Sequence, residues 1–127
     1  MSITSRRRVV VVAGGAIGAV ARALTIEIVD AAELDLLWAT FLVNVVGSLL
    51  LGFLVARHSG RSRSSPLLIP FVGVGILGAF TTFSLFSTEV FELLRVGNWW
   101  LAIAYPLGAV SAGFVAALVG IRSGASR

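Results

Sequence analysis

Four apolar segments, each about as long as a lipid bilayer is thick, constrain this chain more than any other feature of its sequence. They cover residues 9–29, 36–56, 67–94 and 99–121. A helix that crosses roughly 30 Å of hydrocarbon at about 1.5 Å per residue needs about 20 residues. Only 13% of the chain is charged and 57% is hydrophobic, whereas about a quarter of a soluble domain is charged. We therefore predict an all-α membrane protein with four transmembrane helices in a single domain, residues 1–127.

The basic residues are all arginines, and they flank the apolar segments instead of alternating with aromatic residues. This placement is typical of membrane-flanking charges and argues against nucleic-acid binding. If the four segments alternate in direction, one side holds Arg6, Arg7, Arg8, Arg57, Arg61, Arg63, Arg122 and Arg127. Arg95 alone lies on the other side, near acidic residues. The positive-inside rule then predicts that both termini of this multi-pass plasma-membrane protein face the cytoplasm.

The third segment is too irregular to form one uniform helix. Pro66 and Pro70 lie at its start, and three glycines precede a cluster of hydroxyl residues. We expect a break at residues 78–82, near the middle of the segment. Irregular backbone at membrane depth is tolerated where protein or a water-filled cavity satisfies its polar groups, so the break indicates either an ion or substrate site or a kink absorbed by packing.

Two sets of side chains could bind an ion. Thr40, Asn44 and Ser48 are spaced four residues apart and form a polar stripe on the second helix. Thr40 and Ser48 fit helix–helix contacts, whereas an amide near the bilayer centre is costly unless its hydrogen bonds are made. Beyond the break, Phe83, Ser84 and Phe86 combine positive ring edges with a hydroxyl proton, which suits a small anion.

The charged residues within the segments have less specific interpretations. Arg22 could extend toward the outer interface or line a vestibule that attracts anions, and Gly14 and Gly18 before it allow another helix to approach closely. We expect Glu27 and Glu89 near the outer membrane–water boundary, where a carboxylate stays hydrated. The sequence has no cysteine, nucleotide loop, metal-ligand spacing or nucleophile–base pair. It therefore predicts that the protein is not an enzyme.

Three motifs together resemble the bacterial fluoride channels of the Fluc, or CrcB, family. They are residues 14–19 with Arg22, residues 44–48, and residues 78–86, which read Gly-Ala-Phe-Thr-Thr-Phe-Ser-Leu-Phe. The resemblance spans all four helices. It implies a passive, fluoride-selective channel built as an antiparallel dimer, which exports fluoride and lowers its toxic concentration in the cytoplasm.

The same resemblance implies roles for individual residues. A structural sodium ion, not transported, would lie at the dimer centre on backbone carbonyls that match Gly78 and Thr81. The pore amide matches Asn44, the two pore phenylalanines match Phe83 and Phe86, and the vestibule arginine matches Arg22. Further positions along the pore match Ser84 and Glu89.

The chain also departs from the family pattern at two places. Leu85 replaces a threonine of the third motif, which removes one hydroxyl. The fourth helix of similar channels carries a hydroxyl ladder after a tyrosine, whereas Tyr105 is followed here by Ala109, Gly113 and Ala117, and Ser111 lies off that face. These differences put the polar track of the fourth helix in question.

A proton-coupled exporter of the small multidrug type, also a dimer of four-helix chains, is the alternative function. It needs a membrane-embedded carboxylate in the first helix, and Glu27 lies too near the helix end. The uneven arginines also bear on assembly, because an antiparallel homodimer requires one sequence to insert both ways. We predict one orientation for this subunit and an oppositely oriented, related chain as its partner.

Overall fold

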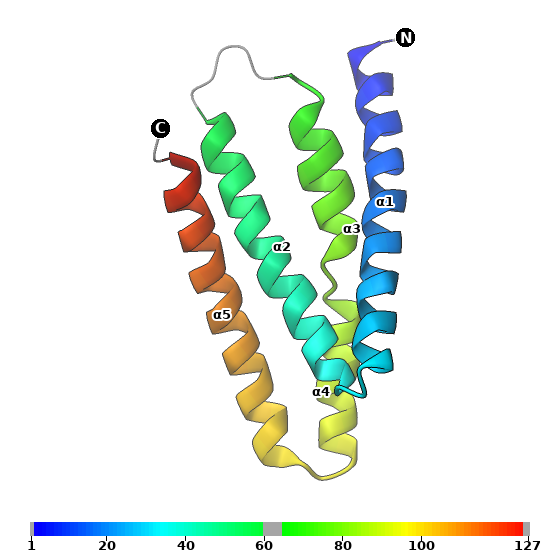
Figure 1. Cartoon of the computed structure of the whole chain (residues 1–127), viewed down its shortest axis with the longest axis vertical. Coiled ribbons are helices and arrows are strands. Elements are labelled where there is room, and N and C mark those ends of the chain that lie inside the picture. Colours follow the sequence, from blue (N-terminus) through cyan, green and yellow to red (C-terminus); the bar gives the residue numbers. More distant parts are fainter. Residues whose placement is uncertain (1, 60–64, 126–127) are drawn as a thin grey trace.

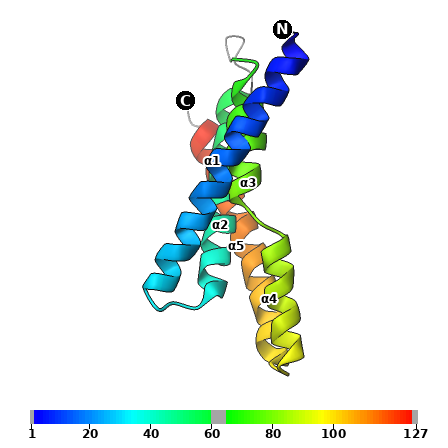
Figure 2. The same cartoon turned by 90° about the vertical axis from the view of Figure 1, so that its right-hand side faces the viewer.

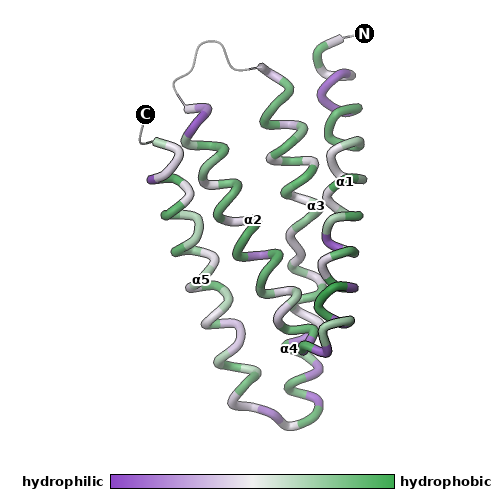
Figure 3. Tube along the Cα trace, in the orientation of Figure 1, coloured by the Kyte–Doolittle hydropathy of each residue, from purple (hydrophilic) through white to green (hydrophobic). Residues whose placement is uncertain are grey.

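The computed structural model describes residues 2–59 and 65–125, and nearly all of them are helical. The helices are α1 (Ile3–Ala31), α2 (Leu36–His58), η1 (Ile69–Leu77), α3 (Gly78–Phe80), α4 (Ser84–Arg95) and α5 (Trp99–Ala125). Four stretches are long and apolar enough to cross a membrane: Ile3–Ala31, Leu36–His58, Ile69–Arg95 and Trp99–Ala125. The predicted all-α fold with four transmembrane helices is therefore confirmed, and Figure 3 shows the apolar residues along all four.

Local capping explains where the first two helices begin. The Ser2 hydroxyl accepts a hydrogen bond from the Ser5 N–H at 3.2 Å, so α1 starts six residues before the apolar segment and includes the three arginines. The Asp35 carboxylate accepts from the Leu37 N–H at 3.0 Å and caps α2. Side-chain oxygens thus satisfy N–H groups that a helix start leaves without partners.

The four spans run alternately up and down, and both termini lie at one end of the bundle (Figure 1). That end holds Arg6, Arg7, Arg8, Arg57 and Arg122, while Arg95 lies at the opposite end and forms an ion pair with Glu92 at 2.7 Å. Arg61, Arg63 and Arg127 lie outside the described residues. Of the described arginines that flank the spans, all except Arg95 therefore lie at one end, as the sequence predicted.

Close helix contacts depend on glycines at two interfaces. A Cβ atom on Gly14 or Gly18 would lie 2.3 Å from the Phe71 carbonyl oxygen or 2.1 Å from that of Ile76, so α1 packs directly on the backbone of η1. Gly120 has the same role between α5 and α2, since its Cβ atom would lie 2.1 Å from the Leu49 oxygen. The predicted close-packing role of Gly14 and Gly18 is confirmed.

The third span consists of three pieces. Its first piece, η1, is a π-helix, in which hydrogen bonds reach five residues back, as from the Gly78 N–H to the Gly73 oxygen. A single turn, α3, follows and ends at Phe80; Thr81 is extended, with φ −74° and ψ 155°, and α4 begins at Ser84. The predicted break at residues 78–82 is thus shifted toward the C-terminus, because residues 78–80 are still helical.

The pieces of the third span have different neighbours. The first two, η1 and α3, pack against α1, whereas α4 packs against α5 and the start of α2. Figure 2 shows α4 directed away from the C-terminal half of α1. The break therefore allows the two halves of one span to follow different helices.

Candidate functional site

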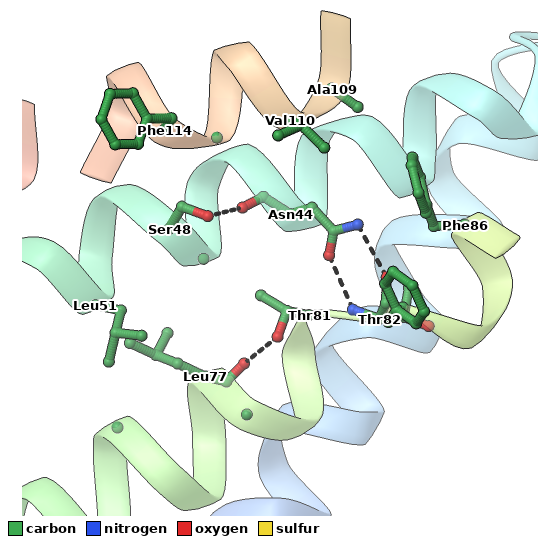
Figure 4. A pocket seen from close by; sticks show the side chains of 15 residues that line it. Asn44, Ser48, Leu51, Leu77, Thr81, Thr82, Phe86, Ala109, Val110 and Phe114 are labelled. Atoms are coloured by element: carbon green, nitrogen blue, oxygen red, sulfur yellow. Dashed lines mark hydrogen bonds between the residues drawn. The ribbon is translucent and has the colours of Figure 1, made fainter. Parts of the chain in front are cut away.

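The break in the third span is held by the side-chain amide of Asn44 on α2. Its Oδ1 accepts a hydrogen bond from the Thr82 N–H, and its Nδ2 donates to the Thr82 carbonyl, both at 2.9 Å (Figure 4). One side chain thus satisfies both backbone groups of a non-helical residue in the interior of the bundle. This is what irregular backbone at membrane depth requires.

These bonds free two carbonyl groups from helical hydrogen bonding. In a continuous helix, the Thr82 N–H would donate to the Gly78 carbonyl and the Leu85 N–H to that of Thr81. Instead, the first donates to Asn44 and the second to the Thr82 hydroxyl at 3.2 Å. Regular bonding resumes at Phe83, whose carbonyl accepts from the amide of residue 87 at 2.9 Å.

Arg22 reaches the same break from α1. Its Nη1 donates to the Thr81 carbonyl at 3.2 Å, and the side chain is half-buried. Of the two interpretations that the sequence allowed, extension toward the interface does not describe this position. The guanidinium turns inward and places positive charge beside the break.

A cavity of about 520 Å³ lies against the break, between α2, α5 and the third span (Figure 4). The described residues that line it are Asn44, Gly47, Ser48, Leu51, Gly73, Leu77, Gly78, Thr81, Thr82, Phe83, Phe86, Ala109, Val110, Gly113 and Phe114. We call it the central cavity. It brings together six residues that the sequence singled out for a site, namely Asn44, Ser48, Gly78, Thr81, Phe83 and Phe86.

Ser84 has another position. It is not among the described residues that line the central cavity; its hydroxyl lies 3.3 Å from that of Thr82, within hydrogen-bond distance. Ser48 does line the cavity, but its hydroxyl donates to the Asn44 carbonyl oxygen of its own helix at 2.7 Å. In this conformation, the hydroxyl proton of Ser48 is used within α2.

Aromatic rings form one end of the central cavity. The centroids of the Phe83 and Phe86 rings are 5.9 Å apart, and Phe86 lies 5.4 Å from the ring of Tyr105 on α5. Phe83 is 80% exposed in this single chain, whereas Phe86 is half-buried. The three rings therefore form a continuous row that leads from an open surface into the bundle.

The wall that α5 contributes to the central cavity is apolar. It consists of Ala109, Val110, Gly113 and Phe114, while Ser111 is exposed and is not among the described lining residues. A Cβ atom on Gly113 would lie 3.5 Å from the Ser48 hydroxyl. The structure thus agrees with the sequence in giving α5 no hydroxyl ladder along this described wall.

Glu89 requires a correction. We expected a hydrated carboxylate at the membrane boundary, but Glu89 is only 8% exposed. Its two carboxylate oxygens accept hydrogen bonds from the hydroxyl of Thr40, which is fully buried, and from that of Tyr105 at 2.7 Å. The correction has a physical cause: α2, α4 and α5 converge here, and two hydroxyl protons replace the water that the carboxylate would otherwise bind.

Sequence reasoning named Thr40, Glu89 and Tyr105 separately and missed that they form one buried cluster. One signal was available. Glu89 lies six residues before the end of an apolar span, and Thr40 and Tyr105 place hydroxyls on two other spans at matching depth. Such a carboxylate is more easily satisfied by those hydroxyls than by water.

A model of a known protein family, described as CrcB-like protein, Camphor Resistance (CrcB), matches residues 9–121. The chain belongs to the CrcB family. The matched region includes most or all of each of the four spans and every described residue that lines the central cavity. The resemblance seen in the three sequence motifs is thereby confirmed.

Several relatives of this CrcB chain are named as fluoride-specific ion channels. FluC 1 of Mycobacterium bovis is 39% identical over 113 residues, which cover 87% of this chain and 84% of the relative. FluC 2 of Thermobifida fusca is 44% identical over 97 residues, covering 74% and 72%. FluC of Magnetococcus marinus is 42% identical over 109 residues, covering 85% and 89%.

These names place the CrcB chain in a family of fluoride-specific ion channels, which move an ion without converting it chemically. The predictions of a multi-pass membrane protein in ion transport, and of a protein that is not an enzyme, are confirmed.

Proposed function

We propose that this chain is the subunit of a passive channel that is selective for fluoride and lets it leave the cytoplasm, which lowers its toxic concentration there. One observation carries the proposal: the Asn44 amide and the rings of Phe83 and Phe86 line one cavity at a broken transmembrane span. The names of the relatives support fluoride as the ion.

The cavity offers donors for a small anion. Moving a bare ion into a medium of low dielectric constant costs tens of kcal/mol by Born estimates unless donors replace its water. The Asn44 amide has two N–H groups, and only one is needed for the Thr82 carbonyl. The other N–H and the positive ring edges of Phe83 and Phe86 can contact an anion, while Arg22 supplies a favourable field.

Fluoride efflux from liposomes that contain the purified protein tests this function. We expect efflux driven by the fluoride gradient alone, with the same rate whether or not a pH gradient is imposed. Dependence on the pH gradient would favour the small multidrug type of proton-coupled exporter instead. Absence of efflux with sodium present, from this chain alone and with its partner, would exclude the channel.

A structural sodium ion fits the backbone at the break. The Gly78 and Thr81 carbonyls are both freed from helical hydrogen bonding, and carbonyl oxygens are suitable ligands for a hard monovalent cation. Thr81 also accepts from Arg22, which leaves one lone pair of its oxygen for a cation. When bound, the cation would offset the dipoles of these oxygens and stabilise the shape of the break.

Sodium can be tested apart from transport. We expect that replacing sodium with a large organic cation lowers the thermal unfolding temperature of the detergent-solubilised protein and stops fluoride efflux. An unfolding temperature that is the same in both salts would contradict a structural role for sodium.

A second subunit is supported by the open side of the central cavity. Phe83, Val110 and Phe114 line this cavity and are all exposed in the single chain. An antiparallel dimer with two pores would cover them and place two breaks near each other. A cysteine introduced at position 110 or 114 should cross-link to the second subunit in membranes. A cysteine at Val12 of α1, which is exposed and is not among the described residues that line the cavity, is the control.

The uneven arginines support a single orientation, with both termini in the cytoplasm and an oppositely oriented paralogue as partner. Reporters fused to the C-terminus of the chain expressed alone measure the orientation. Equal populations facing the two sides would indicate a homodimer and refute the predicted pairing.

A further inference from the structure

A second cavity, of about 380 Å³, lies where α2 begins, at the end of the bundle away from both termini. It is formed by the first turns of α2 and the first half of α5. Its walls include the rings of Trp38, Phe41 and Tyr105, and Asp35 is the only charged residue among the described residues that line it. We call it the Asp35 cavity.

The Asp35 cavity is the neighbour of the central cavity. Ala109 lines both of them, and Tyr105 of the Asp35 cavity is in ring contact with Phe86 of the central cavity at 5.4 Å. The two cavities are therefore separated by this pair of rings. An anion that passes the rings from the central cavity arrives beside Trp38 and Asp35.

The charge at this place is unusual for a path that carries anions. The N-terminus of a helix bears roughly half a positive charge, which attracts anions. Here the Asp35 carboxylate caps α2 through the Leu37 N–H at 3.0 Å and outweighs that partial charge with a full negative one. Arg95, at the same end of the bundle, is already paired with Glu92.

The surroundings strengthen the effect of this carboxylate. Aromatic and aliphatic walls have a low dielectric constant, and a cleft with such walls concentrates the field of the charges that line it. Glu33, two residues earlier, has the same charge and is exposed like Asp35, but it is not among the described lining residues. The chain therefore offers two nearby carboxylates, of which only one lines the cavity.

We propose that the Asp35 cavity is the mouth of the anion path at this end of the subunit, and that the Asp35 carboxylate limits how readily anions pass through it. This inference rests on the proposed channel function. Asp35 would then set the conduction rate electrostatically, without contacting the anion in the central cavity.

The test compares Asp35→Asn with Glu33→Gln in liposomes that report total fluoride efflux. Total efflux is the suitable measure because an antiparallel assembly would place such a mouth on each side. Asn caps a helix about as well as Asp, so Asp35→Asn removes the charge and keeps the start of α2. Asp35→Ser, also a good cap, serves as a second neutral variant.

We expect Asp35→Asn and Asp35→Ser to raise efflux about two- to threefold at ~10 mM ionic strength, with the difference vanishing near ~1 M salt. Glu33→Gln should change efflux much less. Equal effects of the Asp35 and Glu33 variants, or a salt-independent effect, or no increase, would each overturn the inference while efflux from the unmodified protein still supports the channel. Absence of efflux from the unmodified protein would overturn the channel as well.

Discussion

The side chain of Asn44 and the main chain of Thr82 make two reciprocal hydrogen bonds, each 2.9 Å long, across the interface between α2 and the third span. This pair replaces bonds that a continuous helix would make within itself. The break is therefore a tertiary feature, dependent on another helix for its hydrogen bonds.

Replacing Asn44 with Ala should destabilise the protein and abolish fluoride efflux. The substitution leaves a buried N–H and a buried carbonyl of Thr82 without partners, at a cost of about 1–3 kcal/mol each. Thermal unfolding in detergent measures the first effect and liposome efflux the second. Ser48→Ala, one turn away on the same helix, is the control and should lose much less stability and efflux. Equal losses of both in the two variants would refute the special role of Asn44.

Adding a hydroxyl to α5 should improve the central cavity for anions. The Cβ atom of Gly113→Ser would lie 3.5 Å from the Ser48 hydroxyl, an ordinary contact, so we expect little loss of stability. One more hydrogen bond to an anion contributes about 1.5–3 kcal/mol of interaction free energy. If only part of this lowers the barrier to passage, efflux would rise about threefold to tenfold. Gly15→Ser, in open space on α1, is the control. Unchanged efflux for Gly113→Ser would show that the path avoids this wall.

Close packing of α1 on η1 predicts that alanine substitutions at Gly18 and Gly15 differ greatly in their effect on stability. The Cβ atom of Gly18→Ala would lie 2.1 Å from the Ile76 carbonyl oxygen and must displace backbone, whereas nothing lies within 4 Å of the one at Gly15→Ala. We expect Gly18→Ala to cost about 1–3 kcal/mol of unfolding free energy and Gly15→Ala to be neutral or slightly stabilising. Comparable unfolding temperatures for the two variants would contradict the packing.

The buried cluster of Glu89, Thr40 and Tyr105 predicts energetic coupling. Glu89→Gln removes the charge of the acceptor, and Tyr105→Phe removes the donor, of the hydrogen bond at 2.7 Å. In a double-mutant cycle, we expect the double variant to be more stable than the sum of the single effects by about 1–3 kcal/mol. Additive effects on unfolding would mean that the hydroxyl of Tyr105 does not stabilise the carboxylate.

The spans could be predicted from sequence because their signal is local. Hydropathy and length identified all four; α2 begins at Leu36, the first residue of its apolar segment, and only the cap at Ser2 starts a helix, α1, six residues before its segment. Gly14 and Gly18 were also interpretable, since small residues four apart have few roles other than helix contact.

The details of the site depended on partners far away in the chain. The break was predicted too early because Gly78 marks a flexible position, whereas the bonds that end the helix come from Asn44, 38 residues from Thr82. The π-helix of η1 had no sequence signature that we recognised. Glu89 was misplaced for the same reason, since its burial arises only when Thr40 and Tyr105 reach it.

The division of the third span between two neighbours has a consequence for the architecture as a whole. Among the described residues, η1 and α3 lie against α1, while α4 lies against α5 and has no contact with α1. A straight helix has one direction and could follow only one of these neighbours. The break therefore connects two pairs of helices that tilt differently, α1 with η1 and α4 with α5 (Figure 2). The proposed ion path lies at the place where the tilt changes.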